Sequence, residues 1–186
     1  MPFKTTDIPG LVLFEPAVYK DERGWFYESY NEQVFQRQGF DMRFVQDNQS
    51  LSSYGVIRGL HYQLEPYAQT KLVRVLEGRV LDVAVDIRKG SPTYGKHLAI
   101  ELSAENRLQL LIPRGFAHGF SVLSETAQLA YKCDALYNKE SEAGIRFDDP
   151  GLGIDWLIPA DKLIVSEKDR ELPLFSQCRN TFTYHA

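Results

Sequence analysis

Hydrophobic and polar residues alternate along short segments through much of the chain. A period of two residues is typical of β-strands that bury one face. Gly, Pro, Ser, Asn or Glu residues interrupt the pattern between these segments, as they do at turns. We therefore predict an all-β sandwich or jelly roll, with strands near residues 71–75, 81–87, 97–102, 108–112, 116–122 and 129–136.

Local signals predict how some of these segments are connected. The turn residues at 77–78 predict that the first two strands form a hairpin. One short helix is predicted over residues 31–38, because Ser29 and Glu32 fit a capping box and Gly39 can end the helix. The expected fold is thus mostly strands with a few short helices.

Strand parity places several titratable side chains on faces that otherwise carry apolar residues. Lys71 shares a face with Val73, His118 shares one with Phe120, and Tyr131 lies among apolar neighbours. Burying an unpaired ammonium is costly, so Lys71 needs a wet cavity, an anionic ligand or a carboxylate partner. The interior of the predicted barrel is therefore a candidate site.

Composition and charge narrow the class of protein. With 186 residues, 44% of them hydrophobic, and no repeat or Gly/Ser linker, the chain is expected to form one domain over residues 1–186. A net charge of −4 argues against a broad nucleic-acid surface. No apolar run suits a targeting signal or a membrane span, which predicts a cytoplasmic protein. Cys133 and Cys178 lack the spacing of a metal site or disulfide scaffold, and we expect both to be reduced.

Two segments set a histidine among alternating apolar residues. Residues 113–120 read P-R-G-F-A-H-G-F, which fits the P-x-G-x-x-H spacing of cupins, whose double-stranded β-helix (jelly roll) points this histidine into the barrel. Residues 58–63 read R-G-L-H-Y-Q and lack the H-x-H of a metal-binding cupin. His97 and His185 lie outside any ligand spacing. Histidines without clustered ligands favour acid/base chemistry and predict that no metal is bound.

The ordered motifs of the chain resemble those of the dTDP-4-dehydrorhamnose 3,5-epimerase family. The likeness extends over nearly the whole chain, and it is specific because several motifs occur in the family's order. The segments that carry it are G-W-F at 24–26, R-G-L-H-Y-Q at 58–63, K-L-V-R-V at 71–75, the run at 113–120, Y-K-C at 131–133, G-I-R-F-D-D-P at 144–150 and S-E-K-D at 166–169.

This resemblance implies a cofactor-independent and metal-free epimerase. Its substrate would be dTDP-4-dehydro-6-deoxy-α-D-glucose and its product dTDP-4-dehydro-β-L-rhamnose, in dTDP-L-rhamnose biosynthesis. The ketone acidifies the flanking C–H groups, so a base can remove a proton and an acid can return one to the opposite face. By family likeness His61 is the base, Tyr131 the acid, Asp169 the partner of His61, and Lys71 the group facing the enolate oxygen.

The same resemblance implies a set of substrate-binding residues and a partner chain. Guanidinium groups suit a diphosphate, and an aromatic face suits a thymine base. The family also completes its site across a homodimer with exchanged N-terminal strands. The implied diphosphate contacts are Arg23 and Arg58, the thymine contact is Tyr137, and the remaining substrate contacts are Glu28, Gln46, Asp47, Asn48, Lys71, His118, Glu142 and Lys168.

Other interpretations of the individual residues stay open. His61 and His118 also fit hydrogen-bonded core histidines, and Tyr131 fits ordinary strand packing. Ser166 and Asp169 fit the N-terminal capping pattern of a second short helix, which would give Asp169 a structural role.

Other functions also fit parts of the sequence. A metal-dependent cupin such as a dioxygenase would need a clustered ligand set, which the spacing does not provide. A non-catalytic sugar-nucleotide binding module could share the fold, since a fold does not determine function. Within the family, a 3-epimerase or 5-epimerase would invert one ring carbon of a related sugar.

Overall fold

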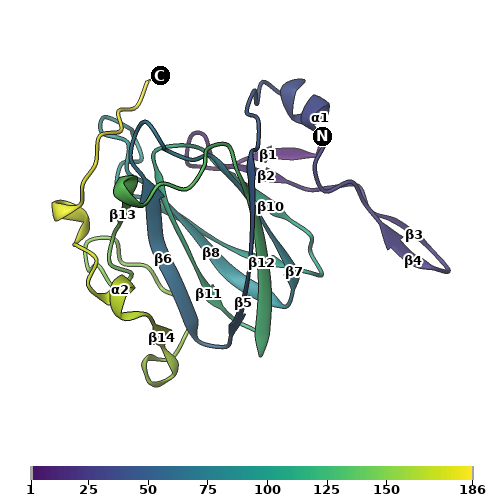
Figure 1. Cartoon of the computed structure of the whole chain (residues 1–186). Helices are drawn as coiled ribbons and strands as arrows, with labels where there is room; N and C mark the ends of the chain where they lie inside the picture. Colours follow the sequence, from purple (N-terminus) through teal and green to yellow (C-terminus); the bar gives the residue numbers. More distant parts are fainter. Residues whose placement is uncertain (1, 186) are drawn as a thin grey trace.

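Over residues 2–185, which the computed structural model describes, two large β-sheets pack face to face (Figure 1). Sheet 1 has the order β1 (Phe3–Thr5), β2 (Val12–Phe14), β10 (Gln109–Ile112), β7 (Lys71–Glu77), β12 (Thr126–Cys133) and β5 (Gln46–Ser53). Sheet 2 has the order β13 (Glu142–Gly144), β6 (Val56–Gln63), β11 (Phe116–Val122), β8 (Arg79–Asp86) and β9 (His97–Ser103), and β14 (Ile164–Val165) joins it parallel to β6. This arrangement confirms the all-β jelly-roll prediction.

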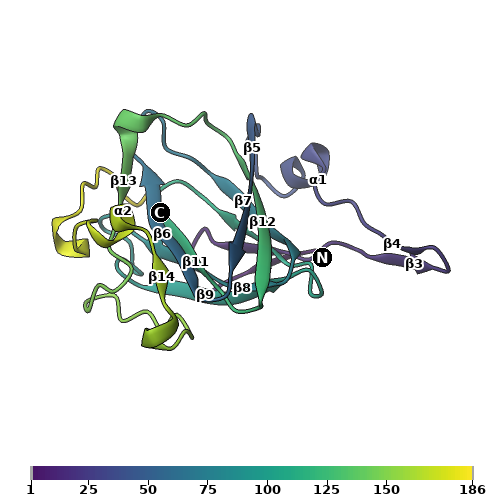
Figure 2. The ribbon, with the colours of Figure 1, turned by 60° about the horizontal axis from the view of Figure 1, so that its bottom comes forward.

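The remaining elements lie outside the two sheets. A hairpin of β3 (Tyr19–Asp21) and β4 (Gly24–Phe26) projects away from the body of the molecule (Figures 1 and 2). No helix among residues 2–185 has the length and apolar character needed to cross a membrane. The helical segments are α1 (Glu32–Gln36), α2 (Glu167–Arg170) and the 3-10 turns Lys139–Ser141, Ala160–Lys162 and Phe175–Gln177.

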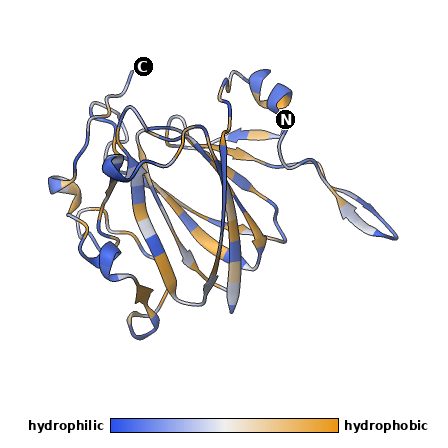
Figure 3. Cartoon of the chain, viewed as in Figure 1, coloured by the Kyte–Doolittle hydropathy of each residue, from blue (hydrophilic) through white to orange (hydrophobic). Residues whose placement is uncertain are grey.

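The central strands β8 and β11 of sheet 2 are buried on both faces along nearly their whole length. Their inward residues pack against sheet 1 in a cluster that includes Val73, Val75, Val80, Ala84, Phe120 and Leu129. Their outward residues pack against the C-terminal third of the chain, in a cluster that includes Leu81, Val83, Val85, Ile145, Phe147 and Trp156. Figure 3 shows these hydrophobic stretches along the strands. Cys133 and Cys178 carry free thiols, as expected.

The predicted hairpin of residues 71–75 and 81–87 is wrong. The strand β7 pairs with β10 and β12 in sheet 1, whereas β8 pairs with β9 and β11 in sheet 2. Gly78 has a φ of +72°, and a Cβ there would lie 2.1 Å from the carbonyl oxygen of Thr126. This glycine therefore makes a tight corner at which the chain crosses from one sheet to the other.

Two predicted boundaries also differ. The helix predicted over residues 31–38 is the shorter α1, and its N-cap is Asn31, whose side chain accepts hydrogen bonds from backbone N–H groups of the first turn. The capping box at Ser29 was therefore wrong. The strand predicted over residues 129–136 spans Thr126–Cys133, because its pairing with both neighbouring strands ends at Cys133.

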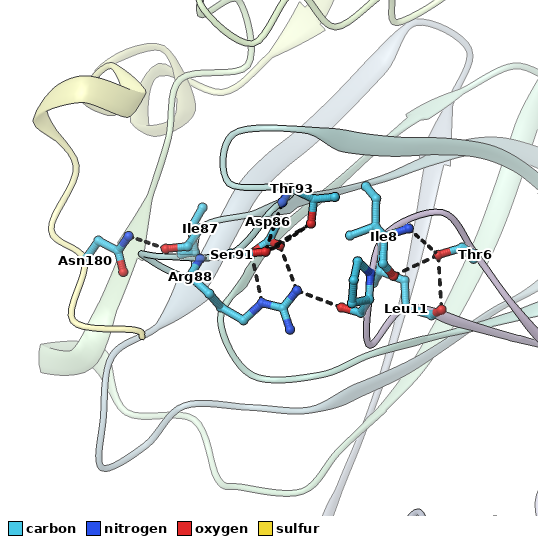
Figure 4. Close-up of polar contacts among 10 residues, drawn as sticks. Thr6, Ile8, Leu11, Asp86, Ile87, Arg88, Ser91, Thr93 and Asn180 are labelled. Atoms are coloured by element: carbon cyan, nitrogen blue, oxygen red, sulfur yellow. Dashed lines mark hydrogen bonds and ion pairs between the residues drawn. The ribbon is translucent and has the colours of Figure 1, made fainter. Parts of the chain in front are cut away.

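A buried ion pair holds the end of β8 to the N-terminal segment (Figure 4). The fully buried carboxylate of Asp86 accepts hydrogen bonds from Arg88, Ser91 and Thr93, and Arg88 also donates to the carbonyl of Pro9 at 2.7 Å. Burial alone raises the pKa of Asp86, but these hydrogen bonds outweigh it and hold the pKa below its usual range.

We expect Asp86→Ala to lower the free energy of unfolding by about 3–5 kcal/mol, because it leaves Arg88 buried without its partner. Urea denaturation would measure this loss. The matched control is Asp161→Ala, which removes an exposed ion pair with Lys162 and should change stability by less than about 0.5 kcal/mol. Equal effects of the two substitutions would contradict a structural role for the Asp86 pair.

Candidate active site

A cavity of about 680 Å³ lies between the two sheets, within the size range of small-molecule sites. Strands β5, β7 and β12 of sheet 1 line one side, β6 and β11 of sheet 2 line another, and the segment from β14 into α2 borders it. The inward parity predicted for Lys71, His118 and Tyr131 is confirmed. The candidate residues that line the cavity are Asn48, Arg58, His61, Lys71, His118, Tyr131, Lys168 and Asp169.

A β-bulge in β6 turns Arg58 and His61 toward the same cavity. In the pairing of β6 with β11, His61 lies opposite His118 and Arg58 lies opposite Phe120. Three residues along β6 therefore span the same distance as two residues along β11, which is a β-bulge. Regular alternation would point Arg58 and His61 to opposite faces. Gly59 has a φ of +128°, and a Cβ there would lie 2.5 Å from a backbone carbon of β11. Only glycine allows this close approach of the strands.

Asp169 orients His61 from α2. One carboxylate oxygen lies 2.7 Å from His61 Nε2, and the other accepts the backbone N–H of Gly59 at 3.3 Å. Burial alone raises the pKa of Asp169, but its contact with His61 outweighs this and keeps the pKa below its usual range. An ionised Asp169 places the imidazole proton at Nε2 and leaves Nδ1 as the basic nitrogen. Ser166 caps α2 by accepting the backbone N–H of Asp169, so the capping and dyad interpretations are compatible.

A second histidine and carboxylate pair lies on the same sheet. His118 Nε2 is 2.9 Å from Asp82, whose side chain is fully buried in β8. The other carboxylate oxygen of Asp82 has no hydrogen-bond partner among the described residues. Sequence reasoning missed Asp82. Its signal was the alternation of Val80, Asp82 and Ala84, which puts an acid on a core-facing row.

Sheet 1 contributes the other polar groups of the interior. Lys71 Nζ lies 5.8 Å from the ring centroid of Tyr131. Burial lowers the pKa of Lys71, while the nearby Cys133, Asp82 and Glu142 partly oppose this shift. Burial raises the pKa of Tyr131, so its phenol keeps its proton at neutral pH. Two histidines on one sheet thus share the cavity with a lysine and a protonated phenol on the other.

An exposed polar cluster lies beside the cavity and is linked to it through Lys168. Lys168 Nζ lies 2.7 Å from Glu142, and the Tyr137 hydroxyl donates to the same carboxylate at 3.1 Å. The pKa of Glu142 is lowered because the hydrogen bonds from Lys168 and Tyr137 outweigh the effect of its burial. Gln46 accepts the backbone N–H of Tyr137 and donates to Asn48.

Three candidate residues lie away from the cavity within this chain. Arg23 is on the projecting β3–β4 hairpin, where it pairs with Asp21. Glu28 lies in the segment that follows this hairpin. The strand alternation of β5 puts Asp47 on the outer face of sheet 1, where it pairs with Lys132 at 2.8 Å.

The titratable side chains in the described part of the chain do not form a ligand cluster for a metal ion. Residues 2–185 contain no group of at least three His, Cys, Asp or Glu side chains arranged to hold one. His61 and His118 instead each use Nε2 to contact a separate carboxylate. The arrangement therefore suits proton transfer more than coordination.

Comparison with known proteins identifies the family. A family model described as dTDP-4-dehydrorhamnose 3,5-epimerase matches residues 5–177. The dTDP-4-dehydrorhamnose 3,5-epimerase of Shigella flexneri is 55% identical over 165 residues, which are 88% of this chain and 90% of that protein. The protein of the same name from Methanothermobacter thermautotrophicus is 54% identical over 169 residues, which are 90% of this chain and 91% of that protein.

Solved structures show the same likeness. The dTDP-6-deoxy-D-glucose-3,5-epimerase of Legionella pneumophila, in complex with dTDP-4-keto-L-rhamnose, is 48% identical, with a TM-score of 0.94 over 99% of this chain and 98% of that one. Sequence, motif order and fold agree over nearly the whole length. The chain therefore belongs to the dTDP-4-dehydrorhamnose 3,5-epimerase family.

Proposed function

We propose that this chain is an isomerase that converts dTDP-4-dehydro-6-deoxy-α-D-glucose to dTDP-4-dehydro-β-L-rhamnose. The observation that carries the proposal is the Asp169-oriented His61 on sheet 2, sharing one cavity with Tyr131 and Lys71 on sheet 1. A base on one sheet and a protonated acid on the other can act on opposite faces of a sugar ring held between them. Membership in the family supports the same reaction.

The chemistry needs only proton transfers. His61 takes a proton from a carbon beside the ketone, the C–H electron pair forms the enolate double bond, and the carbonyl electrons move onto oxygen. Lys71 stabilises the negative charge on that oxygen, and the imidazolium of His61 is stabilised by Asp169. Tyr131 then donates its proton to the opposite face of the carbon. The enolate electrons form the new C–H bond as the carbonyl re-forms. His61 then releases its proton to solvent and Tyr131 regains one from solvent, after which the same steps at the second flanking carbon complete the double inversion.

The nucleotide end of the substrate is assigned to Arg58 and Lys168, which line the cavity, and to the groups beside it. Arg58 binds the diphosphate, Tyr137 stacks on the thymine, and Glu142 and Lys168 hold the substrate near the cavity mouth. Arg23 and Glu28 are remote from the cavity of their own chain, so we assign them, as the motif resemblance implies, to the cavity of a second copy in a strand-exchanged homodimer. His118, Gln46, Asp47 and Asn48 complete the proposed set of contacts.

Proton NMR of dTDP-4-dehydro-6-deoxy-α-D-glucose with the protein in deuterated water tests this function directly. Deuterium should enter at both carbons that flank the ketone, and both should be inverted in the product. Exchange at one carbon would instead identify a 3-epimerase or a 5-epimerase. Binding of the sugar nucleotide without any exchange would identify a non-catalytic binding module.

Catalysis is expected to survive removal of metal ions. Each cavity histidine is paired with a carboxylate rather than grouped with further ligands, and proton transfer to and from carbon needs no Lewis acid when Lys71 stabilises the enolate. Dialysis against EDTA, followed by metal analysis and an epimerisation assay, should leave the rate unchanged. Loss of activity that added metal restores would overturn this prediction.

A further inference from the structure

Gln63 ends the R-G-L-H-Y-Q motif, yet the proposed chemistry gives it no role. Its side chain is only 5% exposed, and each end of its amide is hydrogen-bonded to backbone. The amide nitrogen donates to the carbonyl of Tyr67 at 2.6 Å and to that of Leu136 at 3.2 Å. The amide oxygen accepts the backbone N–H of Asn138 at 2.7 Å. A buried amide satisfied by two separate loops is costly to replace.

Two of these contacts lie on either side of Tyr137 in the chain. Leu136 and Asn138 are the two chain neighbours of Tyr137, so the Gln63 amide bonds to the backbone immediately before and immediately after it. The intervening N–H of Tyr137 itself donates to Gln46 at 2.9 Å. The backbone around Tyr137 is therefore held by two glutamine side chains, one from each sheet.

Hydrophobic packing does not hold this loop. No residue from 134 to 141 is buried, and the side chains of Leu136 and Tyr137 are 61% and 56% exposed. The position of the loop depends on its polar contacts, because little apolar surface is removed from water. Gln63 also lies two residues after His61 on β6, so its contacts tie the Tyr137 loop to the strand that carries the proposed base.

We propose that Gln63 is a positioning residue that holds Tyr137 in place for the nucleotide end of a dTDP-sugar. This inference rests on the proposed function, in which Tyr137 contacts the base. Gln63 does not touch the reacting atoms. It therefore contributes to affinity for the nucleotide and leaves the proton-transfer steps unchanged.

The test is a double-mutant cycle measured by calorimetric titration with dTDP. Gln63→Met keeps the length of the side chain and removes all three hydrogen bonds, which should weaken dTDP binding about tenfold. KM for the dTDP-sugar should rise to a similar extent while kcat stays within about twofold. In a Tyr137→Ala background the same change should alter affinity by less than about twofold, because the residue to be positioned is already gone. Equal losses in both backgrounds, or a fall in kcat at unchanged KM, would overturn the proposal.

Gln69→Met is the matched control, because Gln69 donates to the carbonyl of Ala135 in the same loop. This end of the loop is also held by two hydrogen bonds between Asp134 and Thr70. The affinity of Gln69→Met for dTDP should therefore stay within about twofold of that of the wild type. A loss equal to that of Gln63→Met would show general tethering of the loop and refute a specific role for Gln63.

Thermal unfolding of each variant detects a folding defect, and Gln63→Glu gives a second test of the hydrogen bonds. It keeps the shape and the oxygen that accepts the Asn138 N–H, and it loses the amide N–H groups that donate to Tyr67 and Leu136. Its second carboxylate oxygen would face the carbonyl oxygens of Tyr67 and Leu136, which is unfavourable, so its dTDP affinity should be no higher than that of Gln63→Met. Wild-type affinity would count against the proposal. Because these titrations measure dTDP binding, a wild type that binds dTDP without exchanging protons would refute the epimerase function alone.

Discussion

Replacing His61 with alanine is expected to abolish deuterium exchange at both ring carbons and to lower kcat about 10³-fold or more. His61 is the cavity histidine that Asp169 orients, and it is the group to which the proposed mechanism assigns removal of the proton. The binding of dTDP should be nearly intact, because the nucleotide contacts are assigned to side chains other than His61. Proton NMR in deuterated water measures the exchange, and calorimetry measures the binding.

His97→Ala is the matched control, because His97 lies on β9 and does not line the cavity. It should retain the wild-type rate. Removing His61 also leaves the carboxylate of Asp169 without its closest partner, so thermal unfolding must be compared. His61→Gln can place an amide N–H near the position of Nε2 and so still donate a hydrogen bond toward Asp169, and it should be as inactive as the alanine variant. Near-normal turnover in either variant would make His61 a structural residue.

Tyr131→Phe should separate the two halves of the reaction. The phenol is expected to return a proton to the face opposite His61, so its loss should leave proton abstraction possible while inversion falls about 10²-fold or more. Deuterium exchange would then continue while formation of the inverted sugar slows. Phenylalanine keeps the ring that packs against the interior cluster, so thermal stability should change little.

Tyr54→Phe serves as the control, because Tyr54 lies between β5 and β6 and does not line the cavity. It should leave exchange and inversion at wild-type rates. Equal loss of exchange and inversion in Tyr131→Phe would place Tyr131 before proton return, for example in stabilising the enolate. Inversion at the wild-type rate in Tyr131→Phe would show that the Tyr131 hydroxyl is not catalytic.

The sequence by itself determined the features that depend on neighbouring residues or on ordered motifs. The alternation within single strands predicted an all-β fold and the inward direction of Lys71, His118 and Tyr131, because side-chain direction in a regular strand follows position alone. Ser166 was correctly placed at the start of a short helix, since a cap is a local contact. The order of the motifs along the chain was enough to indicate the family.

Only the tertiary structure decided which segments meet. The turn residues at Gly78 predicted a hairpin, but a turn motif does not determine whether the two strands that it connects pair with each other. Here β7 and β8 pair within different sheets. The bulge at Gly59 depends on the approach of β11, and it overrides the alternation that would separate Arg58 from His61.

The same limit applies to the polar contacts of the site. The pairs His61–Asp169 and His118–Asp82 join residues far apart in the chain, and the hold of Gln63 on the Tyr137 loop is also long-range. A hydrogen bond depends on distance and angle in space, which no local pattern encodes. The residue types and strand faces were therefore readable from the sequence, whereas their partners were set by how the two sheets and the C-terminal segment pack.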